Sequence, residues 1–549
     1  MVTAMKQEAG RAEHLDVLIV GAGLSGIGAA CHLRSRCPQK SFAILEARET
    51  IGGTWDLFRY PGIRSDSDVY TLGYSFEPWV SEQAIADGGS ILNYIRETAR
   101  EHDVEREIRF GHRVLSANWS SLEGRWTVEA ASPRGDTARI TCGFLLLCTG
   151  YYSYPDPYTP RFADQQRYQG TIVHPQNWSD EVEYEDKDVV VIGSGATAIT
   201  LVPALAERAR HVTMVQRSPS YVIPLPATDG LARKLARVLP ARAVYALVRL
   251  KNILQQLIFF ELSRRFPRQI RSLLHRLAAE QLPPEVDPRV HFNPPYNPWD
   301  QRLCVAADGD LFAAIRSGRA SVRTGEIDRF TERGVALRAG EEIEAELIVT
   351  ATGLNLVALG GIELSVEGKE VEVPKAMGYK GSMLSNVPNL AMVLGYTNAS
   401  WTLKCDLTCA YVCRLLNYMD RRGFDRCMPR RDPMMPERPF IDLTSGYVRR
   451  AVEKLPRQGT RHPWRLHQNY FRDLLSLRWG RLDDGVMEFA SAAVSRGRER
   501  AGRASGSSRP VDHDVRLPGR PALNLAERMW RVRRGEQTLA GAEHDGEDH

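Results

Sequence analysis

Residues 16–26 read DVLIVGAGLSG: a short apolar run passes directly into a G-x-G-x-x-G loop, and a helical stretch follows. The apolar run predicts a strand buried within a parallel sheet. In a loop of this pattern the glycines allow a tight turn, close approach of a pyrophosphate to the backbone, and close packing of helix on strand. The unpaired N–H groups at the start of the helix then face the phosphates. The stretch therefore predicts an α/β fold built around a Rossmann-like dinucleotide-binding unit.

The residues after the loop strengthen this prediction. The next apolar segment, FAILE, ends in Glu46, twenty residues after Gly26. An acidic residue at that spacing binds the ribose hydroxyls of a dinucleotide. A glycine turn in an ordinary α/β protein is the alternative, but it does not explain strand, loop, helix, strand and acid together. We interpret this unit as an FAD site, with contacts from Gly21, Gly23, Ser25, Gly26 and Glu46.

A second unit of the same kind begins at the apolar segment VVVI, residues 189–192, and runs into the loop GSGATA. Its second predicted strand, 212–216, is followed by Arg217 and Ser218 and carries no terminal acid. A carboxylate there would repel a 2′-phosphate, whereas a guanidinium pairs with it through two hydrogen bonds. The unit therefore predicts NADPH rather than NADH, and a solvated surface charge is the alternative for Arg217. The expected contacts are Gly193, Ser194, Gly195, Ala196, Thr197, Arg217 and Ser218.

Length, net charge and cysteine content limit the number of domains, the partners and the location that can be expected. At 549 residues the chain is too long for one core, and domains of about 100–200 residues predict about three. The net charge of +5 is too small to indicate nucleic acid as a partner. Nine cysteines without a C-x-x-C pair indicate a reducing compartment, so a cytoplasmic location is expected. The N-terminus lacks the pattern of a signal peptide, and no uninterrupted run of about 18 apolar residues predicts a membrane span.

Two segments differ in character from the nucleotide units. Residues 231–283 are basic and amphipathic, with Pro240 and Pro267 as breaks, and predict a helical insertion. We interpret this insertion as part of the route for substrate; peripheral contact with an anionic membrane surface is the alternative. After residue 490 the chain is rich in Arg, Gly and Ser and then acidic, a composition typical of disorder.

Two motifs carry a family resemblance. Residues 168–178, YQGTIVHPQNW, resemble the F-x-G-x-x-x-H-x-x-x-W fingerprint of Baeyer–Villiger monooxygenases, with Tyr168 in place of Phe. Residues 52–66, GGTWDLFRYPGIRSD, resemble the G-G-x-W-x-x-x-x-[FY]-P-G-x-x-x-D pattern of the same family. With FNPPYNPWDQRLC at 292–304 and GYTNASWTLKCDL at 395–407, residues 14–490 are similar to the type I, thioamide-activating branch of this family, within the flavin-containing monooxygenase superfamily.

The resemblance implies an enzyme that uses FAD, NADPH and O2 to insert one oxygen atom into small organic substrates. Ketones would become esters or lactones through a peroxide at C4a of the flavin. Thioethers or thioamides would be oxygenated on sulfur. The partners implied are therefore small molecules and O2, and the oligomeric state is left open.

The resemblance also implies a division of the chain into domains. Residues 1–13 would form a polar leader, 14–160 and 346–490 the two parts of the FAD-binding domain, and 161–183 the linker. The NADP-binding domain would span 184–345, with the helical insertion at about 231–290, and residues 491–549 would form a low-complexity tail. The segment IVTATG at 348–353 would return the chain to the first domain.

The family's catalytic arginine falls on Arg302 and its active-site aspartate on Asp66, which is implied to pair with that arginine. A guanidinium keeps its charge at any working pH, so it can stabilise a peroxide anion and the oxyanion formed after attack. Gln301 stands where many relatives have a lysine that helps to hold the 2′-phosphate, which shifts more of that task to Arg217. The further cofactor contacts that we expect are Thr54, Trp55, Asp56, Arg64, Ser65, Asp66 and Val114.

The linker residues Gly170, His174 and Trp178 are expected to be structural. Gly170 and the proline after His174 suggest a fixed bend, so the histidine is assigned to that bend rather than to proton transfer. Trp178 is expected to pack against the linker. Downstream, Trp464 is left open between a cofactor contact and ordinary core packing.

Cys405, Cys409 and Cys413 recur every four residues and therefore share one face of a helix. No histidine or acid joins them at metal-ligand spacing. We interpret them as a face of small residues in the core, and no metal site is expected.

Three other functions are compatible with two nucleotide loops. Monooxygenases restricted to nitrogen or sulfur end the linker motif in Phe or Tyr, unlike Trp178, and carry F-A-T-G-Y where this chain has TATGLN. A flavin disulfide reductase needs a closely spaced redox pair near the first helix, and Cys31 and Cys37 do not have that spacing. A sensor without turnover would not need both Asp66 and Arg302.

Overall fold

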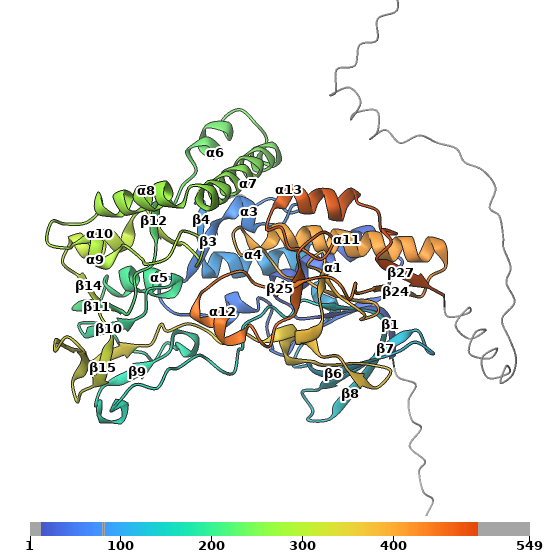
Figure 1. Cartoon of the computed structure of the whole chain (residues 1–549), viewed down its shortest axis with the longest axis horizontal. Helices are drawn as coiled ribbons and strands as arrows, with labels where there is room; N and C mark the ends of the chain where they lie inside the picture. The colour runs from blue at the N-terminus through green and yellow to red at the C-terminus, as the bar shows by residue number, and fades with distance from the viewer. Residues whose placement is uncertain (1–12, 80, 82, 492–549) are drawn as a thin grey trace, which may run out of the picture. The chain divides into compact units, whose positions relative to one another are not determined.

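The computed structural model describes residues 13–79, 81 and 83–491, and Figure 1 shows their arrangement. The first strand, β1 (Glu13–Val20), lies inside a mixed sheet. It runs parallel to β2 (Phe42–Leu45) on one side and to β8 (Thr137–Leu147) on the other. The run from Val17 to Val20 is buried because it has a neighbouring strand on each side and packed layers on both faces. The predicted first Rossmann-like unit is confirmed.

Both halves of the chain contribute to this sheet. Its strand order is β20-β19-β6-β7-β8-β1-β2-β5, and β23 pairs with β8 outside this path. β6, β7 and β8 form an antiparallel meander, and β19 and β23 join it in parallel from much later in the sequence. The additional strands are β5 (Ile108–Arg109), β6 (Arg113–Ser120), β7 (Arg125–Ala131), β19 (Glu363–Val366), β20 (Lys369–Glu370) and β23 (Leu390–Met392).

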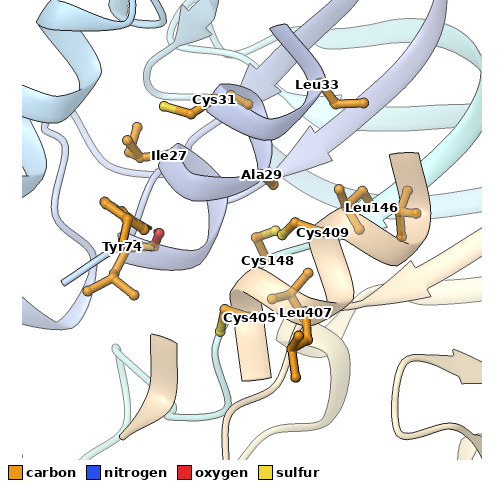
Figure 2. Close-up of a cluster of buried hydrophobic side chains, with 14 of the residues drawn as sticks. Ile27, Ala29, Cys31, Leu33, Tyr74, Leu146, Cys148, Cys405, Leu407 and Cys409 are labelled. Atoms are coloured by element: carbon orange, nitrogen blue, oxygen red, sulfur yellow. Dashed lines mark hydrogen bonds between the residues drawn. The ribbon is translucent and has the colours of Figure 1, made fainter. Parts of the chain in front are cut away.

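Helices α1 (Leu24–Arg36) and α11 (Trp401–Arg422) pack against each other in the core beside this sheet. Figure 2 shows their side chains meeting near Cys148, which follows β8, with Cys409 of α11 next to it. Cys405, Cys409 and Cys413 are all buried on α11, which confirms the predicted face of small residues. Trp464 is also buried in this core, with its ring edge-to-face against Tyr379 at 5.7 Å, so core packing is the alternative that holds.

The second sheet has the order β14-β11-β10-β18-β9, with every neighbouring pair parallel. Its strands are β9 (Thr171–Val173), β10 (Asp188–Ile192), β11 (His211–Gln216), β14 (Ala320–Thr324) and β18 (Leu347–Val349). The predicted second unit is therefore confirmed, but the segment expected to return the chain to the first domain is not where we predicted. β18 pairs with β10 in the second sheet, because its three buried apolar residues complete that sheet between β10 and the linker strand β9. The return to the first sheet comes with β19.

The predicted helical insertion is present as α6 (Gly230–Leu235), α7 (Ala241–Arg265) and α8 (Pro267–Ala279). The two prolines mark its junctions: Pro240 is the residue before α7, and Pro267 is the first residue of α8. Proline is tolerated at these positions because the first N–H groups of a helix have no partner within the helix. In the described part of the chain, α7 is also the helix with the length and mean hydropathy, 1.2, that a membrane span requires, and a third of that window is buried inside the protein.

A buried ion network fastens α7 to the first sheet's domain. Arg249 of α7 lies 3.3 Å from Asp406 of α11, and its Nη1 donates to the carbonyl oxygens of Tyr70 and Gly73 at 2.6 and 2.7 Å. The Asp406 carboxylate also lies 3.2 Å from His32 Nε2 of α1. Although burial works to raise it, the His32 hydrogen bond and the Arg249 charge hold the pKa of Asp406 below its usual value. The insertion is thus held by a charged contact as well as by apolar packing.

The remaining elements complete the described chain. The other helices are α2 (Thr54–Leu57), α3 (Val69–Leu72), α4 (Gly88–Glu101), α5 (Ala196–Leu205), α9 (Pro288–His291), α10 (Asp310–Arg316), α12 (Gly446–Ala451) and α13 (Tyr470–Asp473). The one-turn segments are Glu105–Glu107, Gln165–Arg167, Pro175–Asn177, Ala358–Gly361, Val373–Lys375 and Leu474–Trp479. The paired strands outside the two large sheets are β3 (Arg64–Asp68) with β4 (Ile85–Asp87), β12 (Val222–Leu225) with β13 (Cys304–Ala307), β15 (Ile327–Phe330) with β16 (Gly334–Leu337) and β17 (Glu342–Glu344), β21 (Gly378–Tyr379) with β22 (Met383–Leu384), β24 (Arg426–Pro429) with β27 (Met487–Ala490), and β25 (Glu437–Pro439) with β26 (Arg457–Gly459). The predicted leader and low-complexity tail lie outside the described residues, apart from residues 13 and 491.

Replacing Asp406 by alanine should destabilise the protein strongly, because Arg249 would stay buried without its counter-charge. Breaking a buried pair in this way costs roughly 3–5 kcal/mol. Glu453→Ala is the control, since it removes an exposed pair with Arg457, and exposed pairs contribute about 0–1 kcal/mol. Denaturant unfolding of the full chain measures both changes. Equal midpoints for the two variants would show that the network does not hold α7 in place.

Candidate active site

The first glycine loop joins β1 to α1 and leaves a helix terminus open to a ligand. Gly23 precedes the first helical residue, and no side chain caps the helix, so its first N–H groups are free to bind an anion. Gly26 packs directly beneath the loop, where an added Cβ would lie 1.8 Å from the Gly21 carbonyl oxygen. Any side chain at this position would push the helix away from the loop.

A cavity of about 780 Å³ opens beside this loop. Its size is within the roughly 300–1,000 Å³ of typical ligand pockets. We call this cavity the flavin groove. The predicted site residues that line it are Gly21, Gly23, Ser25, Glu46, Thr54, Trp55, Arg64, Ser65, Asp66, Val114 and Arg302.

Glu46 follows β2 and turns its carboxylate toward the first loop. Its Oε2 accepts a hydrogen bond from the Ala22 N–H at 2.7 Å, and its Oε1 accepts one from the Arg48 N–H at 2.9 Å. Burial raises the pKa of Glu46, and these two backbone hydrogen bonds oppose the shift. The carboxylate is therefore fixed at the groove wall, where the sequence predicts the ribose contact.

Asp56 takes a different place from the one predicted. Its carboxylate is buried and accepts hydrogen bonds from Arg48 Nη2 and Thr50 Oγ1, both at 2.6 Å. Arg48 lines the flavin groove and Asp56 does not. The structure thus places Asp56 behind Arg48, where it orients that guanidinium instead of facing the groove.

The wall that carries Asp66 is attached to the second sheet's helices. Arg64 donates two hydrogen bonds to the Asp310 carboxylate of α10, at 2.5 and 3.2 Å. Gly62 touches α5 so closely that an added Cβ would lie 2.4 Å from the Thr200 carbonyl oxygen. Burial raises the pKa of Asp66, and the charges of Arg302 and Arg64 oppose this effect.

A second, smaller cavity of about 70 Å³ adjoins the flavin groove. Its wall is mainly apolar and includes Leu359, Met392, Phe440 and Leu466. We call it the apolar chamber. The residues that line both cavities are Thr149, Gly150, Tyr151, Arg302, Val357, Tyr396 and Trp401.

Arg302 is the charged group on this shared wall. Its Nη2 lies 3.5 Å from the Tyr151 hydroxyl, and its buried Nε has no hydrogen-bond partner among the described residues. The nearby phenol oxygens, Tyr151 foremost, raise the pKa of Arg302 against the opposing effect of burial. No direct salt bridge joins Arg302 to Asp66 in the described chain; the two interact through space. The guanidinium is therefore a permanent cation with a donor still available.

Sequence reasoning missed the tyrosines around Arg302. Tyr151 and Tyr152 have hydroxyls 3.3 Å apart, and the Tyr151 ring lies 5.1 Å from the Trp401 ring. Burial raises the pKa of Tyr152 and of Tyr447, so both are neutral phenols beside the cation. Tyr151 and Tyr152 come directly after the CTG at the end of β8. That position was a usable signal, because ligands of α/β proteins bind at the carboxyl ends of parallel strands.

The second glycine loop joins β10 to α5 and has the expected open geometry. Gly195 precedes α5 without a side-chain cap, and an added Cβ there would meet nothing within 4 Å. Ser194 Oγ donates to the Ser218 carbonyl oxygen at 2.8 Å, which ties the loop to the end of β11 beside the exposed Arg217. The predicted residues at 193–197 and 217–218 are thus brought together, and they lie outside the flavin groove.

The linker residues make structural contacts. His174 Nδ1 accepts from the Gln176 N–H at 3.1 Å, so its Nε2 carries the proton toward the Gly353 carbonyl oxygen at 3.2 Å. Burial lowers the pKa of His174. Trp178 is buried against Tyr184, and Gly170 lies against the Tyr168 ring, whose hydroxyl donates to the Ala345 carbonyl oxygen at 2.9 Å. Neither cavity is lined by His174 or Trp178, which favours the bend that the sequence predicts.

The comparisons with known proteins agree with this geometry. A family model described as flavin-binding monooxygenase-like matches residues 84–358, and one for NAD(P)-binding Rossmann-like domains matches residues 19–80. The FAD-containing monooxygenase EthA of Mycobacterium tuberculosis (strain ATCC 25618 / H37Rv) is 54% identical over 480 residues, which is 87% of this chain and 98% of the relative. The chain belongs to the flavin-binding monooxygenase-like family.

Solved structures show the same fold. An oxidized steroid monooxygenase bound to NADP matches with a TM-score of 0.63 at 26% identity, over 76% of this chain and 88% of that one. OTEMO in complex with FAD and NADP matches with a TM-score of 0.68 at 19% identity, over 87% of this chain and all of that one. The flavin-binding monooxygenase-like chain described above is therefore an α/β, Rossmann-type protein similar to Baeyer–Villiger monooxygenases in structure.

This flavin-binding monooxygenase binds FAD and NADP, and its residues fit both groups. The flavin groove offers an uncapped helix terminus for a pyrophosphate, the fixed carboxylate of Glu46 for a ribose, and the unpartnered Nε of Arg302. The second loop offers another uncapped terminus with open space over Gly195. The two helix termini and the Arg302 Nε have no capping or hydrogen-bonding side chain among the described residues, and Glu46 is held in place by two backbone N–H groups.

Gly26→Ala should abolish stable FAD binding, because the new methyl group would overlap the Gly21 carbonyl oxygen and displace the loop from α1. Gly195→Ala is the matched control: its methyl group has free space in the protein, so FAD content should stay unchanged. Flavin absorbance per mole of purified protein measures the result. Full flavin occupancy in the Gly26 variant would contradict the close packing described here.

Proposed function

We propose that the chain is a Baeyer–Villiger monooxygenase that consumes NADPH and O2. It converts ketones to esters or lactones and oxygenates the sulfur of thioethers or thioamides. The single observation that carries this proposal is the position of Arg302 on the wall shared by the flavin groove and the apolar chamber. A fixed cation at that junction serves a reaction in which a cofactor and an apolar substrate meet.

Bound FAD, once reduced by NADPH, supplies the activation of dioxygen. The protein's share is to hold charge, orient the substrate and exclude water. Arg302 holds a positive charge where negative charge develops on oxygen, and its free Nε–H is a hydrogen-bond donor for that oxygen. An arginine in a low-dielectric site stabilises such charge without needing to reorganise during the reaction.

Tyr151 positions this arginine. Its hydroxyl lies at the guanidinium, and its ring packs on Trp401, whose Nε1 donates to Ser25 Oγ at 2.8 Å. The chain of contacts runs from the first glycine loop to Arg302. The loop and the cation are therefore linked through Ser25, Trp401 and Tyr151.

The apolar chamber is the place for the reacting end of the substrate, since its volume of about 70 Å³ holds only part of a molecule of ordinary ligand size. Its wall of Leu359, Met392, Phe440 and Leu466 accepts hydrocarbon and excludes water. Its contact with the flavin groove at Arg302 brings the carbonyl or sulfur of an apolar molecule next to the flavin side. The similarity to a steroid monooxygenase supports an apolar substrate.

Two features favour this reaction over the alternatives. The linker ends in a buried Trp178 instead of the Phe or Tyr of monooxygenases restricted to nitrogen or sulfur. All nine cysteines are free, so no redox disulfide is formed in the described chain. The free thiols and the need for NADPH support a cytoplasmic location.

The decisive experiment incubates the purified holoenzyme with NADPH, labelled dioxygen and a panel of ketones, thioethers and thioamides. One labelled oxygen atom per product, as an ester, lactone or S-oxide, is the expected result. Ester formation separates the proposal from a nitrogen- or sulfur-restricted enzyme. NADPH consumption that no compound in the panel stimulates would favour a sensor without turnover.

Arg302→Ala should lower the rate of ester formation by about 10²–10³-fold, the usual effect of removing such a donor. Reduction of bound flavin by NADPH under anaerobic conditions should be unchanged, since the lost charge acts later. Arg302→Lys keeps the positive charge but loses the planar set of N–H donors of the guanidinium, so it should keep more activity than Arg302→Ala. Arg329→Ala, an exposed arginine of β15, controls for a general loss of charge. An Arg302→Ala variant that loses reduction but keeps normal oxygenation would refute this role.

Arg217→Ala should raise the KM for NADPH by about 10- to 100-fold, which corresponds to roughly 1.5–3 kcal/mol for a hydrogen bond to a charged group. The KM for NADH should change little, because NADH lacks the 2′-phosphate. Arg319→Ala in the same sheet's domain is the matched control, with no effect on either cofactor expected. Equal changes for NADPH and NADH would show that Arg217 does not contact the phosphate.

A further inference from the structure

Helix α7 leaves one apolar face uncovered. Leu247, Leu250, Leu254, Ile258 and Leu262 are exposed to 49%, 47%, 40%, 56% and 41%. They recur every three or four residues, so they form one continuous line along the helix, which we call the α7 stripe. Leucine and isoleucine in such a line are unusual at the surface of a monomer that has no partner.

The opposite face of α7 is fixed to the protein. Tyr245, Val248, Arg249, Asn252 and Ser263 are buried there. Arg249 is held by Asp406 and by two backbone carbonyl oxygens. Because this inner face is anchored, the α7 stripe points outward as a permanent feature of the fold.

The neighbouring helices extend the apolar surface. Leu231 of α6 and Val238 after it are exposed to 41% and 75%, and Phe266 between α7 and α8 and Leu273 of α8 to 42% and 40%. Figure 1 shows α6 and α7 at the upper edge of the described part of the molecule, with α8 beside them. The stripe is therefore the centre of a broader face made by the three helices.

This face is strongly basic. Residues 229–280, which are the three helices with their caps, contain eleven arginines or lysines, of which Arg249 is buried, and three acids, Asp229, Glu261 and Glu280, whereas the whole chain has a net charge of only +5. The exposed basic residues that form no ion pair with another described residue are Arg233, Lys234, Arg237, Arg242, Arg265, Arg268 and Arg276. Positive charge flanking an exposed apolar line is the pattern of helices that lie in the interface of anionic membranes.

We propose that the face formed by α6, α7 and α8 docks on the surface of an anionic lipid membrane. The α7 stripe enters the boundary between headgroups and acyl chains, and the surrounding arginines and lysines contact the lipid phosphates. Docking would then hold the apolar chamber close to the acyl-chain layer of the membrane, where apolar substrates accumulate.

The positive charge of this face and the anchored inner face of α7 favour docking on a membrane surface over two alternatives, which are contact with a second copy of the chain and crossing of the membrane by α7. A second copy meeting the same face through a two-fold axis would bring two sets of like charges together. Crossing of the membrane by α7 would require breaking the buried contacts of Arg249 with Asp406. Docking on the surface keeps these contacts and pairs the basic residues with negative charge.

The test is co-sedimentation of the full-length holoenzyme with vesicles of phosphatidylcholine alone or of three parts phosphatidylcholine to one part phosphatidylglycerol. The wild type should bind the anionic vesicles at least tenfold more strongly than the neutral ones, and high salt should weaken this binding. A stripe variant, Leu250→Gln with Leu254→Gln and Ile258→Gln, should lose binding by tenfold or more. A charge variant, Arg242→Gln with Arg265→Gln and Arg268→Gln, should lose the preference for anionic lipid.

The control carries Leu122→Gln and Met434→Gln, two exposed apolar residues far from the insertion in sequence, and should bind as the wild type does. Flavin content and NADPH oxidation without vesicles should be equal in all variants, which separates lost docking from misfolding. Equal vesicle binding by the wild type and the stripe variant would overturn the proposal. A stripe variant that instead changes the mass measured by light scattering, with no effect on vesicles, would assign the face to a second copy and would also overturn it.

Discussion

Parallel strands must end at the same edge of a sheet, and this constraint places most of the chemically important residues. Val20 of β1 lies opposite Leu147 of β8 in the register of the first sheet. The glycine loop after β1 and the tyrosines after β8 therefore emerge side by side. The same rule in the second sheet brings the loop after β10 next to the chain that leaves β18. The two cavities are consequences of where these strands stop.

Burial of a charge without a direct counter-ion gives the site its character. Arg302 has neutral phenols around it and Asp66 at a distance, so its charge is not cancelled within the protein. Such an arrangement costs free energy in the absence of an anion. The site is therefore most stable when a negative group, or an oxygen that becomes negative, lies against the guanidinium. A surface arginine would gain much less from the same contact because water screens it.

Local patterns were enough to predict the two nucleotide units and the helical insertion. The strand, glycine loop and helix follow one another within about a dozen residues, and Pro240 and Pro267 mark the ends of helices wherever these pack. The placement of β18 could not be predicted in the same way. Three buried apolar residues fit any parallel strand. Which strands they pair with depends on where the whole fold leaves a position in a sheet, here between β10 and β9.

The contacts missed in the site are those between residues distant in the sequence. Arg64 and Asp310 are 246 positions apart, and Tyr151 and Arg302 are 151 apart. Asp56 was assigned to the cofactor because its motif suggested it, yet a nearby guanidinium and hydroxyl take its carboxylate first. Motifs identify which residues gather at a site, whereas hydrogen-bond competition decides which of them faces the ligand.

The clamp formed by Gly62 on α5 and Arg64 on α10 has a mechanical consequence. The segment that carries Asp66 belongs by sequence to the first nucleotide unit, but it is fastened to the second. Any rotation of the second unit that keeps these contacts moves Asp66 with it. That movement alters the width of the flavin groove near Arg302. Loading of the reductant and reshaping of the oxidation site would then be a single coupled movement.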